Sequence, residues 1–242
     1  MIRGAYFLKN KIGCLIIRCF GVPFDGFYFL PDNNKTYYFI KMQPELIKKN
    51  ILEISERNQN KAFAIIDELK IIDCWIIFGA VANQVGSLRT GLLMKNLDID
   101  FHIYSDSFSI TESFGAVALI AQNQKIRNIS YTNLLDTEEQ CLEWHLHYLD
   151  DENNEWKIDF IHILKGSRYE GYFENVADRI KTVMTPEQKL TILSIKNDAP
   201  ADLKIKGIEI YQAVIRDNVK NFTDFLQWRN NNYTDKIIEW MP

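Results

Sequence analysis

The chain has 242 residues, of which 47% are hydrophobic and 25% charged. These are the proportions of a folded globular protein, and they exclude a disordered or fibrous chain. The 28 Lys and Arg residues are outnumbered by 32 Asp and Glu residues, which gives a formal net charge of -4. A protein that neutralises many phosphates usually carries a basic surplus, so we expect a small-molecule partner and regard nucleic acid as an unlikely one.

The N-terminal residues 1–41 are rich in aromatic and β-branched residues and contain a turn sequence at Pro31-Asp32-Asn33-Asn34. This pattern predicts a short β extension of two or three antiparallel strands. Pro44 then suits the first turn of a helix, and isoleucines follow it at helical spacing.

A second helix is predicted from about Lys61. Its apolar residues repeat at spacings of three and four, at Ile65, Leu69, Ile72 and Ile76. Gly79 is expected to end this helix in a left-handed conformation.

Strands and two more helices follow, and the strand at 97–104 alternates strictly. Its alternation places Asp98, Asp100 and His102 on one face and apolar residues on the other. The other predicted elements are strands at 80–85, 126–131, 141–148 and 155–164, a short helix at 87–94 and a helix at 111–122.

The periodicity is helical from Tyr172 to the end of the chain, with helix starts at Thr185 and Gly207. A sheet preceded and followed by helices predicts an α+β fold. We therefore divide the chain into a β extension at 1–41, a catalytic core at 42–165 and a helical C-terminal region at 166–242.

The chemistry lies in three short sequences. Gly86-Ser87 follows a predicted strand, where a residue without a side chain lets the backbone approach a phosphate closely. Asp98 and Asp100 project from one face of a strand and together suit a hard divalent cation such as Mg²⁺. Asp159 lies between apolar residues of a later strand, and three carboxylates converge if the two strands are neighbours.

This order of motifs resembles the nucleotidyltransferase superfamily typified by DNA polymerase beta, over roughly residues 61–164. Gly86 to Gly91 is similar to that family's phosphate-binding turn, and Asp98, Asp100 and Asp159 match its metal-binding triad. The helical C-terminus is similar to the small-molecule branch, which includes the aminoglycoside and lincosamide nucleotidyltransferases. The resemblance implies a mixed β-sheet flanked by helices.

The resemblance also implies a reaction. An acceptor hydroxyl attacks the α-phosphorus of a nucleoside triphosphate and pyrophosphate leaves, with two Mg²⁺ ions stabilising the attacking and leaving oxygens. The three aspartates are expected to hold the ions, with Asp159 either a ligand or the base. Gly86 and Ser87 are expected to bind the β- and γ-phosphates, and the candidate cations for the triphosphate are Arg89, Lys95, Lys204 and Lys206.

Two alternatives remain open at this point. The phosphate turn would be Gly79-Ala80 instead of Gly86-Ser87 if residues 75–78 formed a strand. The Asp-x-Asp sequence also suits a metal-dependent glycosyltransferase, although that class normally has a longer nucleotide-binding sheet ahead of the motif, or a non-catalytic nucleotide-binding module of the same fold.

Two further features have a structural and a functional interpretation. His145 and His147 share a strand face, where ordinary packing competes with metal chelation. Residues 136–155 contain eight acidic residues and no Lys or Arg. They are expected to form a solvated hairpin tip, and the alternative is a negative rim that attracts a cationic acceptor.

The apolar runs are too short for a membrane span, which needs about 20 residues, and no cleavage site follows the N-terminal basic residues. We therefore expect a cytoplasmic monomer or homodimer without a membrane partner. The four cysteines, at 14, 19, 74 and 141, form no C-x-x-C pair. They predict neither a disulfide framework nor a zinc site, and we expect them to be reduced and mostly buried.

Overall fold

The computed structural model describes residues 5–9, 15–19, 26–29, 38–41 and 44–242, with side chains from Glu45 onward. It separates into two compact units, Met1–Asn50 and Ile51–Pro242, and each is described by itself. The first unit contains the predicted extension. The second contains most of the predicted core and the whole predicted helical region.

The first unit holds two antiparallel hairpins. One pairs β1 (Ala5–Lys9) with β2 (Leu15–Cys19), and the other pairs β3 (Gly26–Phe29) with β4 (Tyr38–Lys41). The described residues of the extension therefore form four strands, where we expected two or three. The predicted turn at 31–34 lies outside the described residues.

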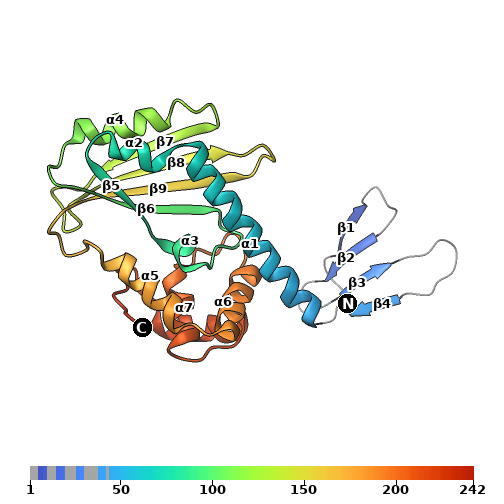
Figure 1. Cartoon of the computed structure of the whole chain (residues 1–242). Coiled ribbons are helices and arrows are strands. Elements are labelled where there is room, and N and C mark those ends of the chain that lie inside the picture. The colour runs from blue at the N-terminus through green and yellow to red at the C-terminus, as the bar shows by residue number, and fades with distance from the viewer. Residues whose placement is uncertain (1–4, 10–14, 20–25, 30–37, 42–43) are drawn as a thin grey trace. The chain divides into compact units, whose positions relative to one another are not determined.

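The second unit is built on a five-stranded sheet with the order β5-β6-β9-β8-β7. Its strands are β5 (Ala80–Gln84), β6 (Asp98–Ser105), β7 (Ile126–Asn133), β8 (Cys141–Leu149) and β9 (Glu155–Leu164). β6 and β9 run parallel, and the other neighbours are antiparallel. With helices on both sides (Figure 1), this mixed sheet confirms the predicted α+β fold.

One face of the sheet is covered by α2 (Ile71–Ile76) and α4 (Ile110–Ile120), as Figure 1 shows. The core on this side contains the apolar residues of β6, as the alternation predicted. Trp75 of α2 meets Phe160 of β9 edge to face at 5.6 Å between ring centroids. The apolar face of β6 is thus fixed inward, which leaves the face with Asp98 and Asp100 for other contacts.

The first long helix differs from the prediction. α1 (Pro44–Glu68) is one helix of 25 residues, where we expected two helices and the second to continue to residue 79. The helical conformation is interrupted at Lys70, whose φ of 49° is left-handed, and α2 starts at the next residue. The break rotates the later stripe outward, so Ile72 and Ile76 are 46% and 57% exposed.

Gly79 does leave α2 in the left-handed conformation that we expected, with φ +71°. Residues 75–78 are helix and turn, and β5 starts only at Ala80. The condition for a phosphate turn at Gly79-Ala80 is therefore not met, and Gly86-Ser87 is the turn that follows the strand.

The helical region contains α5 (Tyr172–Val183), α6 (Pro186–Asp198), α7 (Gly207–Ile215) and α8 (Phe222–Asn232). α6 begins as predicted, because Thr185 and Gln188 form a capping box ahead of it. Helix does not continue to the end of the chain, however. Residues 233–242 form neither helix nor strand, and Lys206 Nζ donates to three of their backbone carbonyls.

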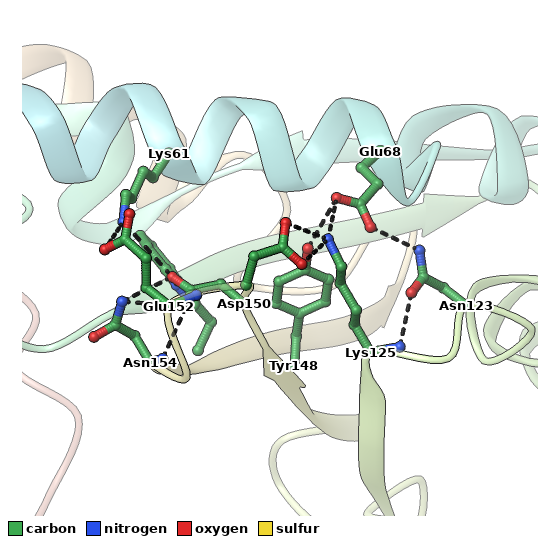
Figure 2. Close-up of polar contacts among 10 residues, drawn as sticks. Lys61, Glu68, Asn123, Lys125, Tyr148, Asp150, Glu152 and Asn154 are labelled. Atoms are coloured by element: carbon green, nitrogen blue, oxygen red, sulfur yellow. Dashed lines mark hydrogen bonds and ion pairs between the residues drawn. The ribbon is translucent and has the colours of Figure 1, made fainter.

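The hairpin tip between β8 and β9 is fastened to α1 (Figure 2). Lys61 pairs with Glu152 at 2.6 Å, and Lys125 pairs with Glu68 and Asp151 at 3.2 and 3.1 Å. These acidic side chains are engaged with α1 and the α4–β7 loop, and no residue of 136–155 lines the main cleft described below. The structure thus favours the hairpin-tip interpretation over the negative rim.

We expect Asp150→Ala to lower the free energy of unfolding by about 2 kcal/mol at pH 7. Burial alone would raise the pKa of Asp150, but hydrogen bonds from Asn154, Trp156 and the Glu152 backbone outweigh it and lower the pKa to about 2. Because this pKa lies below the unfolded value near 4, the stabilisation is complete above about pH 4. It is lost as the pH falls toward 2.

Urea denaturation of the wild type and the variant at pH 7 and pH 3 measures this difference. Asp151→Ala is the matched control, because its side chain is 86% exposed and an ion pair so exposed contributes little stability. Equal losses in the two variants would show that the hydrogen bonds of Asp150 do not stabilise the hairpin.

Candidate active site

Parallel pairing of β6 and β9 brings the three predicted aspartates to one place. Asp100 and Asp159 are direct neighbours in the register of these strands, and Asp98 lies two residues earlier on the same face as Asp100. All three line a cleft of about 630 Å³ between the sheet and the helical region. We expected the three carboxylates to converge only if their two strands were neighbours, and β6 and β9 are neighbours.

Neighbouring carboxylates destabilise the charged forms of Asp98 and Asp100. Burial, followed by the charges of Asp98 and Asp159, raises the pKa of Asp100 to about 7. Burial also raises the pKa of Asp98, with Lys157 opposing the shift and Asp159 adding to it. Like charges collected in a partly buried hollow are stabilised by a bound cation.

The donor set fits a hard divalent ion. Carboxylate oxygens are the ligands that Mg²⁺ prefers, and Mg²⁺ usually takes only one or two from the protein and the rest from phosphates and water. Asp98, Asp100 and Asp159 supply such oxygens without sulfur or nitrogen donors among them. These residues therefore fit the predicted Mg²⁺ ions.

Gly86 brings the turn after β5 against Asp100. Its φ of +66° is left-handed, and a Cβ added there would lie 2.1 Å from Asp100 Oδ2. The preceding Val85 N–H donates to the Asp100 carbonyl at 2.9 Å. The backbone thus approaches the carboxylate as closely as only glycine permits. Gly86 is the first residue of α3 (Gly86–Thr90), and Ser87 follows it in that helix.

Lys196 of α6 is the cation at this turn, and the sequence analysis missed it. Its Nζ donates to Ser87 Oγ at 2.8 Å, to the Leu92 carbonyl at 2.9 Å and to Tyr211 Oη at 2.9 Å. It lines a smaller hollow together with Ser87 and Asp98. Lys196 stands in a buried apolar stretch of a helix, and nothing in its local sequence marks it.

Two of the predicted triphosphate contacts have other partners. Arg89 donates to Asp178 at 2.9 and 2.7 Å and to the Gln84 carbonyl at 3.0 Å, and it does not line the main cleft. Lys95 donates to the carbonyls of Asn197 and Ala199 at the end of α6, although it lines the smaller hollow with Lys196. Neither side chain lines the main cleft. Each instead stabilises the joint between the sheet and the helical region.

The remaining two lysines differ. Lys206 lines the main cleft, but its Nζ is held by the carbonyls of residues 234–236. Lys204 lies in a neighbouring hollow that also reaches Asp98 and contains Lys157, Arg229 and Tyr233. That hollow is the more basic side of the site.

Much of the lining of the main cleft is apolar and aromatic. Its members on β9, α5, α7 and the C-terminal segment include Ile161, Tyr172, Phe173, Ile208 and Ile238. His102 adjoins them, and burial lowers its pKa to about 4, so it is neutral at pH 7. Such a lining suits a planar base or the apolar part of an acceptor.

His145 and His147 each pair with a carboxylate. His145 Nδ1 lies 2.8 Å from Asp159 Oδ1, and His147 Nδ1 lies 2.6 Å from Glu155 Oε1. Glu139, Cys141 and Glu143 are the one group of three potential metal ligands in the described residues whose ligand atoms all lie within 4.8 Å of one another. The carboxylate oxygens of Asp98, Asp100 and Asp159 are therefore spaced more widely than that. Burial raises the pKa of the Cys141 thiol to about 12, which keeps it protonated. Cys74 and Cys141 are free and buried, as predicted.

No protein-family model matches the chain, and no curated protein matches it. Two solved structures of Cid1, one described as an RNA terminal uridylyl transferase and one as a poly(U) polymerase bound to MgGTP, each give a TM-score of 0.50. They are 15% and 14% identical to this chain, over 70% and 71% of it and 52% and 55% of their own chains. A cytoplasmic RNA terminal U-transferase gives 0.47 at 16% identity, over 70% of this chain and 50% of its own.

The two Cid1 structures show that the chain has the fold of nucleotidyltransferases. It spans about half the length of the structures that it matches. In the five-stranded sheet, β5 is the one strand that precedes the Asp-x-Asp strand in sequence. The longer sheet that a glycosyltransferase normally has ahead of this motif is therefore not part of it. In the described residues, no helix is both long and apolar enough to cross a bilayer.

Proposed function

We propose that this protein is a Mg²⁺-dependent nucleotidyltransferase, which transfers a nucleoside monophosphate from a nucleoside triphosphate to a hydroxyl group and releases pyrophosphate. The observation that carries the proposal is the placement of Asp98, Asp100 and Asp159 on neighbouring strands, opposite the Gly86-Ser87 turn. A cytoplasmic location, where triphosphates and Mg²⁺ are supplied, is part of the proposal.

Asp98, Asp100 and Asp159 are the residues proposed to hold two Mg²⁺ ions. When bound, the ions supply charge stabilisation for the attacking and leaving oxygens of an in-line displacement. Asp159 is also within the cleft where an acceptor hydroxyl must lie, so it is the candidate to accept that proton.

Ser87 and Lys196 are proposed to bind the triphosphate. Their 2.8 Å contact brings a hydroxyl and an ammonium group to one point beside Asp98. Charge-assisted donors of this kind suit the oxygens of the β- and γ-phosphates. Lys196 thus takes the role that we first gave to Arg89 and Lys95.

The acceptor is proposed to be a small molecule, because the chain is acidic overall and the cleft is largely apolar. A second candidate, an RNA end, is favoured by one observation: the hollow on the other side of Asp98 contains Lys157, Lys204 and Arg229. The structural neighbours are also described as acting on RNA ends or making poly(U).

The test is to incubate the protein with each labelled nucleoside triphosphate, Mg²⁺ and a panel of hydroxyl-bearing small molecules or short RNAs. We expect release of pyrophosphate and a labelled acceptor, with no product when Mg²⁺ is chelated. Labelled product with RNA alone would replace the small-molecule acceptor by the second candidate. A glycosyl product from a nucleotide sugar would contradict the proposal.

We expect Lys196→Met to lower kcat/KM for the triphosphate about 100-fold, because the site loses its cation at the Ser87 turn. Lys189→Met is the matched control on the same helix, since Lys189 lies near Arg89 and Gly91 and lines neither the main cleft nor the smaller hollow of Lys196. Steady-state kinetics at saturating Mg²⁺ measure both. Equal effects of the two substitutions would remove Lys196 from the phosphate site.

A further inference from the structure

The three central strands carry a row of polar side chains across the sheet. Asp100 of β6 pairs in register with Asp159 of β9, and Asp159 pairs in register with His145 of β8. His145 is therefore placed by the same sheet geometry that gathers the aspartates. The proposed function assigns it no role.

The contact between His145 and Asp159 is a hydrogen bond of 2.8 Å from Nδ1 to Oδ1. An ionised carboxylate can only accept, so Nδ1 of His145 carries the proton and donates. The next group beyond His145, Glu143, has its Oε2 3.7 Å from Nε2, which exceeds hydrogen-bond length. Asp159 is thus the partner that orients this imidazole, and the imidazole in turn orients the carboxylate.

Asp159 needs such a support. Its side chain is 27% exposed, and Asp100 occupies the adjacent position of β6, so the two carboxylates repel each other when both are charged. A donor on Oδ1 limits the rotation of the carboxylate. It leaves Oδ2 as the oxygen without a contact to His145.

We propose that His145 is a positioning residue for the nucleotidyl transfer that we infer for this site, which means that this inference rests on the proposed function. Its hydrogen bond to Oδ1 holds Asp159 in the rotamer in which Oδ2 meets the cation or the acceptor hydroxyl. His145 itself touches neither.

The chain provides a matched control. His147 lies two residues further along β8 on the same side, and its Nδ1 also contacts a carboxylate, at 2.6 Å. That partner is Glu155, which is not one of the three aspartates. Loss of His147 therefore removes a comparable pair without touching the carboxylate triad.

The experiment compares His145→Ala, His145→Asn and His147→Ala with the wild type in pyrophosphate release. We expect His145→Ala to lower kcat about 30-fold, in the range found when the partner of a metal ligand is removed, with KM for the triphosphate changed less than about 2-fold. His145→Asn keeps a donor near the Nδ1 position and is expected to recover most of the loss. His147→Ala is expected to match the wild type.

A double-mutant cycle separates positioning from a general structural effect. If His145 acts only through Asp159, His145→Ala adds no further loss of kcat to Asp159→Asn. A full additional loss in the double variant, or a kcat of His145→Ala equal to the wild type, would overturn the inference. A loss in His147→Ala as large as in His145→Ala would also overturn it.

Binding of Mn²⁺ to the free protein, followed by calorimetry, keeps the two proposals distinguishable. We expect His145→Ala to weaken Mn²⁺ binding several-fold and His147→Ala to leave it unchanged. If the wild type releases no pyrophosphate from any triphosphate, the proposed function fails, while the Mn²⁺ arm still decides whether His145 positions Asp159. Unchanged Mn²⁺ affinity in His145→Ala would then count against the inference.

Discussion

Asp100→Asn is expected to lower turnover at least about 1000-fold and to make the protein more stable in the absence of divalent cations. The loss of turnover follows because an amide replaces a charged ligand at the centre of the triad. The gain in stability follows because the carboxylate is buried beside two others, which raises its pKa to about 7.

The sign of the pH effect is fixed by that shift. The folded pKa lies above the unfolded value near 4, so the folded wild type binds the extra proton and loses stability as the pH rises from about 4 to about 7. Removing the charge is worth about 4 kcal/mol at pH 8 by this linkage. The advantage of Asp100→Asn should disappear at pH 4.

Thermal unfolding in a chelator at pH 4 and pH 8, together with pyrophosphate release in Mg²⁺, measures both effects. Asp106→Asn is a control on the exposed turn directly after β6. Turnover that survives Asp100→Asn would place the chemistry elsewhere. A variant that is less stable than the wild type at pH 8 would show that the charge of Asp100 is not costly.

Gly86→Ala is expected to lower turnover about 100-fold. An added Cβ would lie 2.1 Å from Asp100 Oδ2, so either the turn or the carboxylate must move. Displacement of a reacting group by about 1 Å costs about this factor. The φ of +66° adds a backbone strain of about 1 kcal/mol for any residue with a Cβ.

Gly79→Ala is the matched control for that strain. Gly79 has φ +71°, and its added Cβ meets nothing within 4 Å. We expect both variants to lose stability in thermal unfolding, Gly86→Ala by more because of its contact with Asp100, but a loss of turnover only in Gly86→Ala. A comparable loss of turnover in Gly79→Ala would revive the alternative phosphate turn at Gly79-Ala80.

The parts of the site that lie on strands could be predicted from the sequence, because alternation along a strand decides which face each side chain takes. Asp98 and Asp100 follow from the period of two in β6, and Asp159 follows from its position between buried residues of β9. The strand neighbours themselves followed only from the family resemblance. The register that pairs Asp100 with Asp159 is a long-range contact without a local signal.

The cations of the site show where local reasoning ends. Arg89 stands close to the phosphate turn in sequence, but Asp178, 89 residues later, holds it. Lys196 reaches Ser87 from a helix 109 residues away. The interruption of the helix at Lys70 also has no local signal. The helical spacing predicted that Ile76 would be buried, but Trp75 packs against the sheet instead.

A crystal structure with Mn²⁺ and a non-hydrolysable nucleoside triphosphate would show whether the three aspartates hold metal ions beside the Gly86-Ser87 turn. We expect anomalous density for the ions about 2.1 Å from carboxylate oxygens of Asp98 and Asp100, with Asp159 at one ion and the triphosphate on Ser87 and Lys196. Ions bound instead at Glu139 and Glu143, or a triphosphate away from the Gly86-Ser87 turn, would contradict this expectation.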